Sequence, residues 1–110
     1  MGVKYRVLKM QEFDSDFKKL QKNEKERVDR FLLQLSEKGG LVGKPLGVKF
    51  FREKKFEGKR LYYLIYDEVL VVLAVAISDK KAQRATINRI MPKFSYYQQY
   101  VSEALKQLKD

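Results

Sequence analysis

The sequence predicts one α+β domain over residues 1–110, in which an antiparallel three-stranded core sheet and an N-terminal strand are backed by a helical hairpin. Three observations lead to this fold class. Residues 50–77 hold three β-rich runs separated by short polar breaks, a pattern typical of consecutive β-hairpins. Residues 12–38 carry apolar side chains at helical spacing, and this periodicity returns in a tail of about residues 79–110. We therefore expect two layers, followed by C-terminal helices.

The N-terminal third predicts a strand and two helices. Residues 4–10 alternate in the manner of a first strand. Asp14 or Ser15 can cap a short helix, and Asn23 with Glu26 resembles a capping box for a second helix that ends before Gly39-Gly40. The two helices form a helical hairpin whose polar faces are balanced in charge, so we expect a structural role for it. Its apolar faces should cover one side of the sheet. The apolar stripes of the two helices are Phe13, Phe17 and Leu20, then Val28, Phe31, Leu32 and Leu35.

The middle of the chain predicts a charged strand followed by an aromatic one. Period-two alternation over Val48–Phe56 places Arg52 and Lys54 on one side and Lys55 on the other. A turn at Glu57-Gly58 leads into the next strand. In that strand we expect one face to be buried, with Leu61, Tyr63 and Ile65. The opposite face then carries Arg60, Tyr62, Leu64 and Tyr66.

The apolar run Val69–Ile77 predicts the central strand of the sheet. Its residues are apolar at both odd and even positions, so neither face of the strand can contact water. After this strand, Ser78 or Asp79 can cap a helix that runs to about Met91. Pro92 then breaks the helical pattern, and Ser95 can cap a last helix. The apolar stripe of that helix is Tyr97, Val101, Ala104, Leu105 and Leu108.

Composition excludes several classes of chemistry. The chain has no cysteine and no histidine, which removes disulfides, thiol nucleophiles, zinc ligands of those types and the usual general base. We expect no metal and no cofactor. The N-terminus lacks a signal h-region, and the longest apolar run is far short of the roughly 20 residues that a membrane helix needs. We therefore expect a cytoplasmic protein that makes no membrane contact.

The net charge of +10 is unevenly placed. Residues 44–60 carry seven basic side chains against Glu53 and Glu57, and residues 79–93 carry five against Asp79. Such concentration favours a surface that faces a polyanion, and the polyanion we expect is nucleic acid. The alternative is that the basic residues merely solvate two loops.

Arg60 and its tyrosine neighbours form the most suggestive group for RNA contact. An arginine can clamp a phosphate while aromatic rings stack on bases. The alternative for Tyr62 and Tyr66 is ordinary packing against neighbouring strands.

The order of elements, the run Gly58-Lys59-Arg60-Leu61-Tyr62-Tyr63 and the acidic turn Asp67-Glu68 together resemble the RelE/ParE superfamily of type II toxins. The resemblance covers residues 4 to about 84. It implies a RelE-like domain bound by a cognate acidic antitoxin. In the RelE branch it implies metal-independent cleavage of mRNA on the ribosome, and in the ParE branch inhibition of DNA gyrase.

The family's site residues map onto this chain with departures. Arg60 matches the family's arginine without a gap. Arg52 and Lys54 match its two strand cations only if the preceding turn is one residue shorter, because an ungapped comparison puts Phe51 and Glu53 there.

The remaining family positions lie after the long strand. The family's next arginine falls on Lys80 or Lys81. Thr86 stands where the family has a tyrosine, and Tyr96 or Tyr97 would replace it only by folding back.

RNA cleavage by its own 2′-hydroxyl needs a base, cations that stabilise the phosphorane, and an acid for the leaving oxygen. A lysine surrounded by cations loses its proton more readily, so a lysine can act as base where histidine is absent. The resemblance thus predicts Lys54 as base, Arg60 as phosphate clamp and Lys80 or Lys81 as a second clamp. The other predicted RNA contacts are Arg52, Lys55, Lys59, Tyr62 and Arg84.

Three functions remain open at this point. The favoured one is a ribosome-dependent endoribonuclease toxin, whose partners are mRNA on the ribosome and an antitoxin. The second is a protein of the toxin fold that inhibits a partner such as gyrase by binding it. The third is a basic nucleic-acid-binding module without catalysis.

Overall fold

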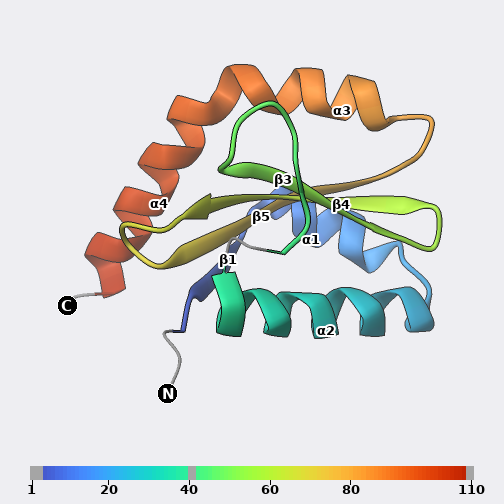
Figure 1. Cartoon of the computed structure of the whole chain (residues 1–110), viewed down its shortest axis with the longest axis horizontal. Helices are drawn as coiled ribbons and strands as arrows, with labels where there is room; N and C mark the ends of the chain where they lie inside the picture. The colour runs from blue at the N-terminus through green and yellow to red at the C-terminus, as the bar shows by residue number, and fades with distance from the viewer. Residues whose placement is uncertain (1–3, 40–41, 109–110) are drawn as a thin grey trace.

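The computed structural model describes residues 4–39 and 42–108, and places a sheet between two sets of helices (Figure 1). Gly40 and the last two residues of the predicted tail lie outside the described residues. In chain order the elements are β1 (Arg6–Lys9), α1 (Gln11–Lys18), α2 (Lys22–Lys38), β2 (Lys44–Pro45), β3 (Phe51–Phe56), β4 (Lys59–Tyr66), β5 (Val71–Asp79), α3 (Gln83–Ile90), the 3-10 turn η2 (Met91–Lys93) and α4 (Phe94–Leu108).

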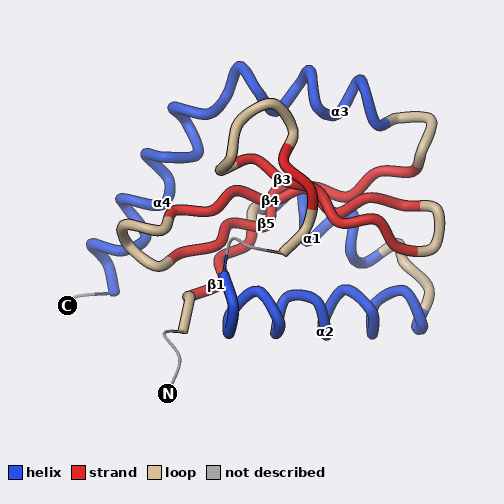
Figure 2. The backbone as a smooth tube through the Cα atoms, viewed as in Figure 1, coloured by secondary structure: helices blue, strands red, loops and turns tan. Residues whose placement is uncertain are grey.

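The five strands form a mixed sheet in the order β1-β5-β4-β3-β2 (Figure 2). β1 pairs with β5 in parallel, and the other neighbours are antiparallel. The predicted α+β class, with an antiparallel core of three strands and an added N-terminal strand, is therefore confirmed. The sequence did not reveal β2, because two residues give no periodicity.

β5 is an interior strand, since it lies between β1 and β4, although the middle strand of the five is β4 rather than the predicted β5. β5 begins two residues later than expected. Val69 and Leu70 belong to the turn after β4 and are 48% and 38% exposed, and Leu70 has a φ of 58°. From Val71 to Ala76 every residue is buried.

Helices cover both faces of the sheet. On the first face α1 and α2 pack against β4 and β5, and this core includes Phe31, Leu61 and Tyr63. On the second face α3 and α4 pack against the same strands, which makes a third layer beyond the two that we expected. This two-sided cover explains why β4 and β5 are apolar at odd and even positions alike. A bulge opposite Tyr62 and Tyr63 adds one residue to β5.

The helix starts differ from the predicted caps. α1 begins at Gln11, so neither Asp14 nor Ser15 caps it, and the Asp16 carboxylate instead accepts a hydrogen bond from the Ile77 amide at 2.9 Å. The capping box of α2 joins Gln21 and Glu24 rather than Asn23 and Glu26.

Of the C-terminal helices, α3 begins later than predicted and α4 begins earlier. β5 extends through Asp79, so α3 starts only at Gln83. The Asp79 carboxylate accepts from the Ala82 amide at 2.9 Å in the connecting turn. Pro92 falls in the first turn of η2, where its missing N–H is tolerated, and α4 follows directly from Phe94 without a cap at Ser95.

None of the helices in the described part of the chain is both long enough and apolar enough to cross a lipid bilayer.

The interior position of β5 can be tested with Leu73→Asp. Leu73 is fully buried, and a carboxylate there would have no partner, a cost comparable to the total stability of about 5–15 kcal/mol of a small domain. We expect no cooperative thermal transition by circular dichroism. Leu33→Asp is the matched control, because Leu33 is 61% exposed on α2 and should tolerate the charge. A soluble Leu73→Asp variant that melts cooperatively would contradict the placement.

Candidate functional site

The β3–β4 turn decides which charged side chains share a face. Glu57 and Gly58 have φ values of 47° and 76°, as a tight two-residue hairpin turn requires, and Phe56 pairs with Lys59. Continuing the register, Lys55 pairs with Arg60 and Lys54 pairs with Leu61. Since directly paired residues point to the same side of a sheet, Lys55 shares a face with Arg60 and Lys54 does not.

The predicted convergence of Lys54 and Arg60 is therefore wrong. The Lys54 Nζ lies 5.4 Å from the centroid of the Phe31 ring, on the face covered by α2. The observed register places Arg52 and Lys54 together on the face away from Arg60. Phe51 and Glu53 stand on the Arg60 face where the resemblance implies cations.

Arg52 lies on the face away from Arg60, and its guanidinium binds backbone carbonyls of a loop. Its Nε donates to the Val42 carbonyl at 3.1 Å, its Nη2 to the Gly43 carbonyl at 3.0 Å and its Nη1 to the Lys49 carbonyl at 3.0 Å. Tyr63 donates to the same Val42 carbonyl, and burial raises the pKa of Tyr63 to about 12 despite the nearby Arg52. These bonds fix the segment between α2 and β3.

Arg60 lies on the face opposite the helical hairpin, as predicted, but it is buried. It is 7% exposed, and within the described residues its Nε has no hydrogen-bond partner. Glu53 lies on the same face and is more deeply buried, and its carboxylate accepts a hydrogen bond of 2.9 Å from Gln83 at the start of α3. Helix α3 thus covers the strands that carry Arg60.

Tyr62 completes a polar cluster of three buried and two half-buried residues, which we define as Glu53, Arg60, Tyr62, Ser78 and Gln83. The Tyr62 and Ser78 hydroxyl oxygens are 2.8 Å apart. Burial raises the pKa of Tyr62, and the hydrogen bond to Ser78 partly offsets this, so the ring carries a neutral hydroxyl. Tyr62 is 0% exposed and its ring lies against Phe51, so no face of the ring is open to a nucleic-acid base. Packing against the neighbouring strand therefore accounts for Tyr62.

Five other predicted cations gather at one end of the sheet. Lys59 pairs with Asp79, so Lys80 and Lys81 follow directly beside the β3–β4 hairpin, and α3 starts at the same end (Figure 1). Except for Lys59, these cations are exposed and form no ion pair with an acidic side chain in the described part of the chain. We call this surface the cationic end, and its members are Lys55, Lys59, Lys80, Lys81 and Arg84.

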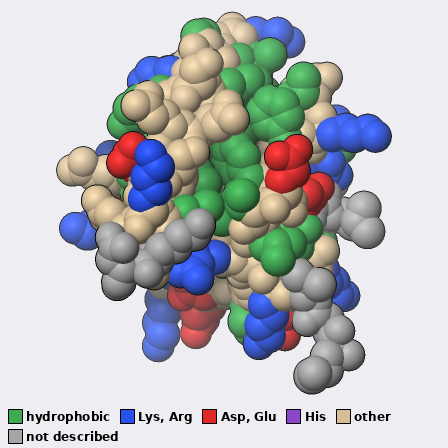
Figure 3. Space-filling view, turned by 90° about the vertical axis from the view of Figure 1, so that its left-hand side faces the viewer, with side chains coloured by type: hydrophobic (Ala, Val, Ile, Leu, Met, Phe, Trp, Pro, Cys, Tyr) green, Lys and Arg blue, Asp and Glu red, His purple; other side chains and the backbone are tan. Residues whose placement is uncertain are grey.

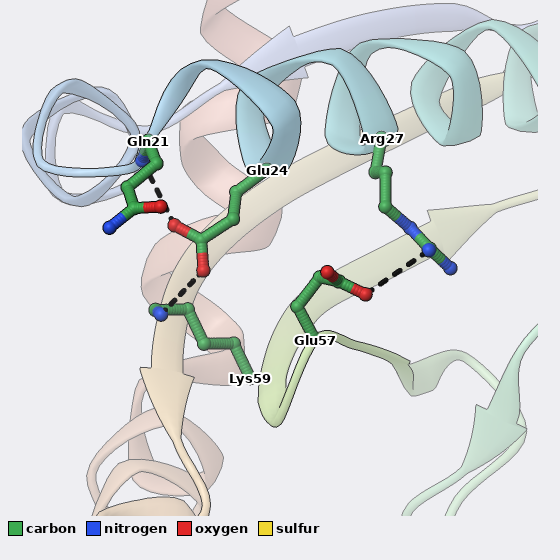
Figure 4. A network of polar contacts seen from close by, with 5 residues as sticks. All are labelled: Gln21, Glu24, Arg27, Glu57 and Lys59. Atoms are coloured by element: carbon green, nitrogen blue, oxygen red, sulfur yellow. Dashed lines mark hydrogen bonds and ion pairs between the residues drawn. The ribbon is translucent and has the colours of Figure 1, made fainter.

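Two ion pairs fasten α2 to the β3–β4 hairpin (Figure 4). The Lys59 Nζ lies 2.7 Å from Glu24, and the Arg27 Nη1 lies 3.2 Å from Glu57. The Lys59 ammonium, followed by the Gln21 amide, lowers the pKa of the Glu24 carboxyl. Sequence reasoning missed Glu24, because its partner lies 35 positions away.

An apolar groove of about 480 Å³ runs between α4 and the β4–β5 turn. Figure 3 shows a band of hydrophobic side chains on this side of the molecule, with acidic side chains beside it. The groove is lined by Phe50, Val69, Phe94 and Leu105 among others, and Asp67 and Glu68 also border it.

Nowhere in residues 4–39 and 42–108 do three or more His, Cys, Asp or Glu side chains come together in a group that could hold a metal ion.

Among solved structures, the arrangement matches that of toxins from type II systems, and the chain has a RelE-like toxin fold. The E. coli RelBE toxin–antitoxin complex matches at 22% identity and a TM-score of 0.62, over 68% of this chain and 95% of its own. The RelBE2 toxin–antitoxin complex of Mycobacterium tuberculosis matches at 27% sequence identity and a TM-score of 0.61, over 71% of this chain and 93% of its own. A mutant of the E. coli toxin RelE in the free state matches at 19% sequence identity and a TM-score of 0.65, over 80% of this chain and 99% of its own. No family model and no curated protein matches the chain.

The bond between Gln83 and Glu53 can be tested by Gln83→Ala. Removing the amide leaves a buried carboxylate without its donor, so we expect the free energy of unfolding in urea to fall by about 1–3 kcal/mol. Arg84→Ala, at the exposed neighbouring position of the same helix, is the control and should change stability far less. Equal losses in the two variants would mean that this bond does not hold α3 on the sheet.

Proposed function

We propose that this chain is the toxin of a type II toxin–antitoxin pair, held inactive by a cognate acidic antitoxin, and that it cleaves mRNA on the ribosome without a metal. The observation that carries the proposal is a RelE-like fold bearing a concentrated cationic end. Exposed cations on one edge of a domain attract polyanions and neutralise their phosphates.

The roles of individual residues follow from their positions. Lys80, Lys81, Lys55 and Arg84 are exposed at the cationic end and would contact RNA phosphates. Lys55, paired across from Arg60, replaces Lys54 as the candidate base, because Lys54 lies on the other face. Arg60 keeps its proposed role as phosphate clamp only when α3 moves aside, since its guanidinium is now buried.

A second function is favoured by that burial. With Arg60 7% exposed and Lys54 on the opposite face, the described conformation presents no exposed pair of base and clamp. A toxin-fold protein that inhibits gyrase or another partner by binding, or a nucleic-acid-binding module, would need only the exposed cations.

The antitoxin proposal is supported by surfaces of two kinds. Antitoxins accompany the toxins in the solved complexes from E. coli and Mycobacterium tuberculosis. In this chain an acidic segment would neutralise the cationic end, and apolar side chains of the same partner would pack in the groove beside α4.

Induced expression separates the two functions. We expect the wild-type chain to stop growth and to produce RNA ends within translated codons. Lys80→Gln combined with Lys81→Gln should reduce cleavage at least tenfold without changing the melting temperature, because both side chains are exposed. Lys18→Gln combined with Lys19→Gln, at the C-terminal end of α1, is the control of equal charge. Damaged DNA with intact messages would instead support the binding function.

Salt dependence tests the cationic end directly. The logarithm of the RNA affinity should fall linearly with the logarithm of salt concentration, with a slope that increases by about 0.7 for each phosphate contacted. The Lys80/Lys81 variant should have a shallower slope than the Lys18/Lys19 control, measured by fluorescence anisotropy. Affinity that stays flat between low and moderate salt would exclude polyanion binding as the basis of function.

A further inference from the structure

A second cationic site lies on the face opposite Arg60, between α2 and β3. It is a hollow of about 200 Å³ whose polar rim consists of Arg27, Arg30, Gln34 and Lys54 and whose floor includes Phe31 and Phe56. We call it the α2 pocket. Positions 27, 30, 31 and 34 are spaced at three and four residues, so one stripe of the helix supplies most of the lining.

The pocket holds more positive than negative charge. Arg30 and Lys54 are exposed and have no acidic partner in the described part of the chain. Arg27 forms an ion pair with Glu57 at 3.2 Å, but both side chains are substantially exposed. Such a pair contributes only about 0–1 kcal/mol to the stability of the fold. Arg27 and Arg30 also repel each other across one helical turn. An anion bound between them would remove this repulsion.

The walls of the pocket are fixed before any ligand binds. Glu24 and Lys59 join α2 to the hairpin at 2.7 Å, beside the Arg27–Glu57 pair (Figure 4). The Phe31 ring packs edge-on against Tyr63, with ring centroids 5.6 Å apart. The floor and the flanking elements of the pocket are therefore held by the fold itself, and only the exposed rim side chains must be ordered when a ligand binds.

We propose that the α2 pocket binds a backbone phosphate of nucleic acid. Its volume of about 200 Å³ corresponds to roughly seven water molecules, at about 30 Å³ each, which is enough room for a phosphate group. Phe31 and Phe56 are buried in the floor, so neither presents an open ring face on which a base could stack. Two guanidinium groups and an ammonium can engage several phosphate oxygens, with each guanidinium able to bind two.

This site gives Lys54 a different role from the one the family resemblance implies. It contacts a phosphate on the α2 face and takes no part in chemistry at Arg60. Because Lys54 and Lys55 are consecutive in β3 and point to opposite faces, a bound strand would be held on both sides of the β3–β4 hairpin. The inference rests on the proposed function only in taking RNA as the polyanion.

The test measures binding of a single-stranded RNA oligonucleotide to the full chain. Lys54→Met removes the charge while keeping an apolar stem over Phe31, and should weaken RNA binding on the order of fivefold, with a salt slope lower by about 0.7. Lys25→Met is a closely matched control, since the Lys25 Nζ likewise lies near an aromatic ring, 5.9 Å from the Phe17 centroid, and Lys25 is on α2 outside the pocket. It should change the affinity less than twofold.

A second variant and a second probe keep the test decisive. Arg30→Gln alters an exposed side chain, so it should fold normally and weaken RNA binding to a similar degree. Equal effects of Lys54→Met and Lys25→Met would overturn the inference. So would a hexaglutamate peptide that perturbs the α2 amide signals in NMR at lower concentration than RNA, because the pocket would then fit an acidic protein segment.

The outcome is separable from that of the proposed function. A chain that binds RNA through Lys54 and Arg30 but never inhibits growth would support the α2 pocket and overturn the toxin proposal. Growth inhibition that persists while Lys54→Met and Arg30→Gln both leave RNA affinity unchanged would overturn the α2 pocket alone.

Discussion

The two-residue turn at Glu57 and Gly58 is the constraint on which the distribution of charge depends. It fixes the pairing of β3 with β4, and a shift of one residue would exchange the faces of every side chain in β3. Lys54 consequently stands over α2 and Lys55 stands beside Arg60. The chain therefore has two separate cationic surfaces, on either side of one hairpin, rather than a single convergent group.

Burial on both faces of β4 and β5 determines the environment of Arg60. A buried guanidinium without a partner costs free energy, but Glu53 lies on the same face and carries the opposite charge. The two charges act in opposite directions on the pKa of Tyr62. The two buried charges beneath α3 are thus of opposite sign, and Gln83 supplies a hydrogen bond to the acidic one.

Much of the fold was predictable because apolar periodicity reports burial directly. The interior position of β5, the helical hairpin and its placement away from Arg60 all followed from that periodicity, and Phe17 and Leu32 lie in the first-face core as expected. The site was less predictable. Alternation sorted Arg52 and Lys54 from Lys55 correctly, but only the turn geometry shows which set faces Arg60. The cover by α3 and the Glu24–Lys59 pair depend on long-range packing that local patterns do not encode.

Binding and catalysis place unequal demands on these positions. Attraction between charges extends over about 10 Å at moderate ionic strength, so it tolerates changes in which strand position carries a lysine. Catalytic groups must be held to within about 0.5 Å, so a change of face removes a group entirely. If the chain cleaves RNA as proposed, Phe51 and Glu53 on the Arg60 face would therefore affect cleavage far more than affinity. Under the proposed function, polyanion binding at the cationic end would need no rearrangement, whereas cleavage through the buried Arg60 would need α3 to leave the sheet.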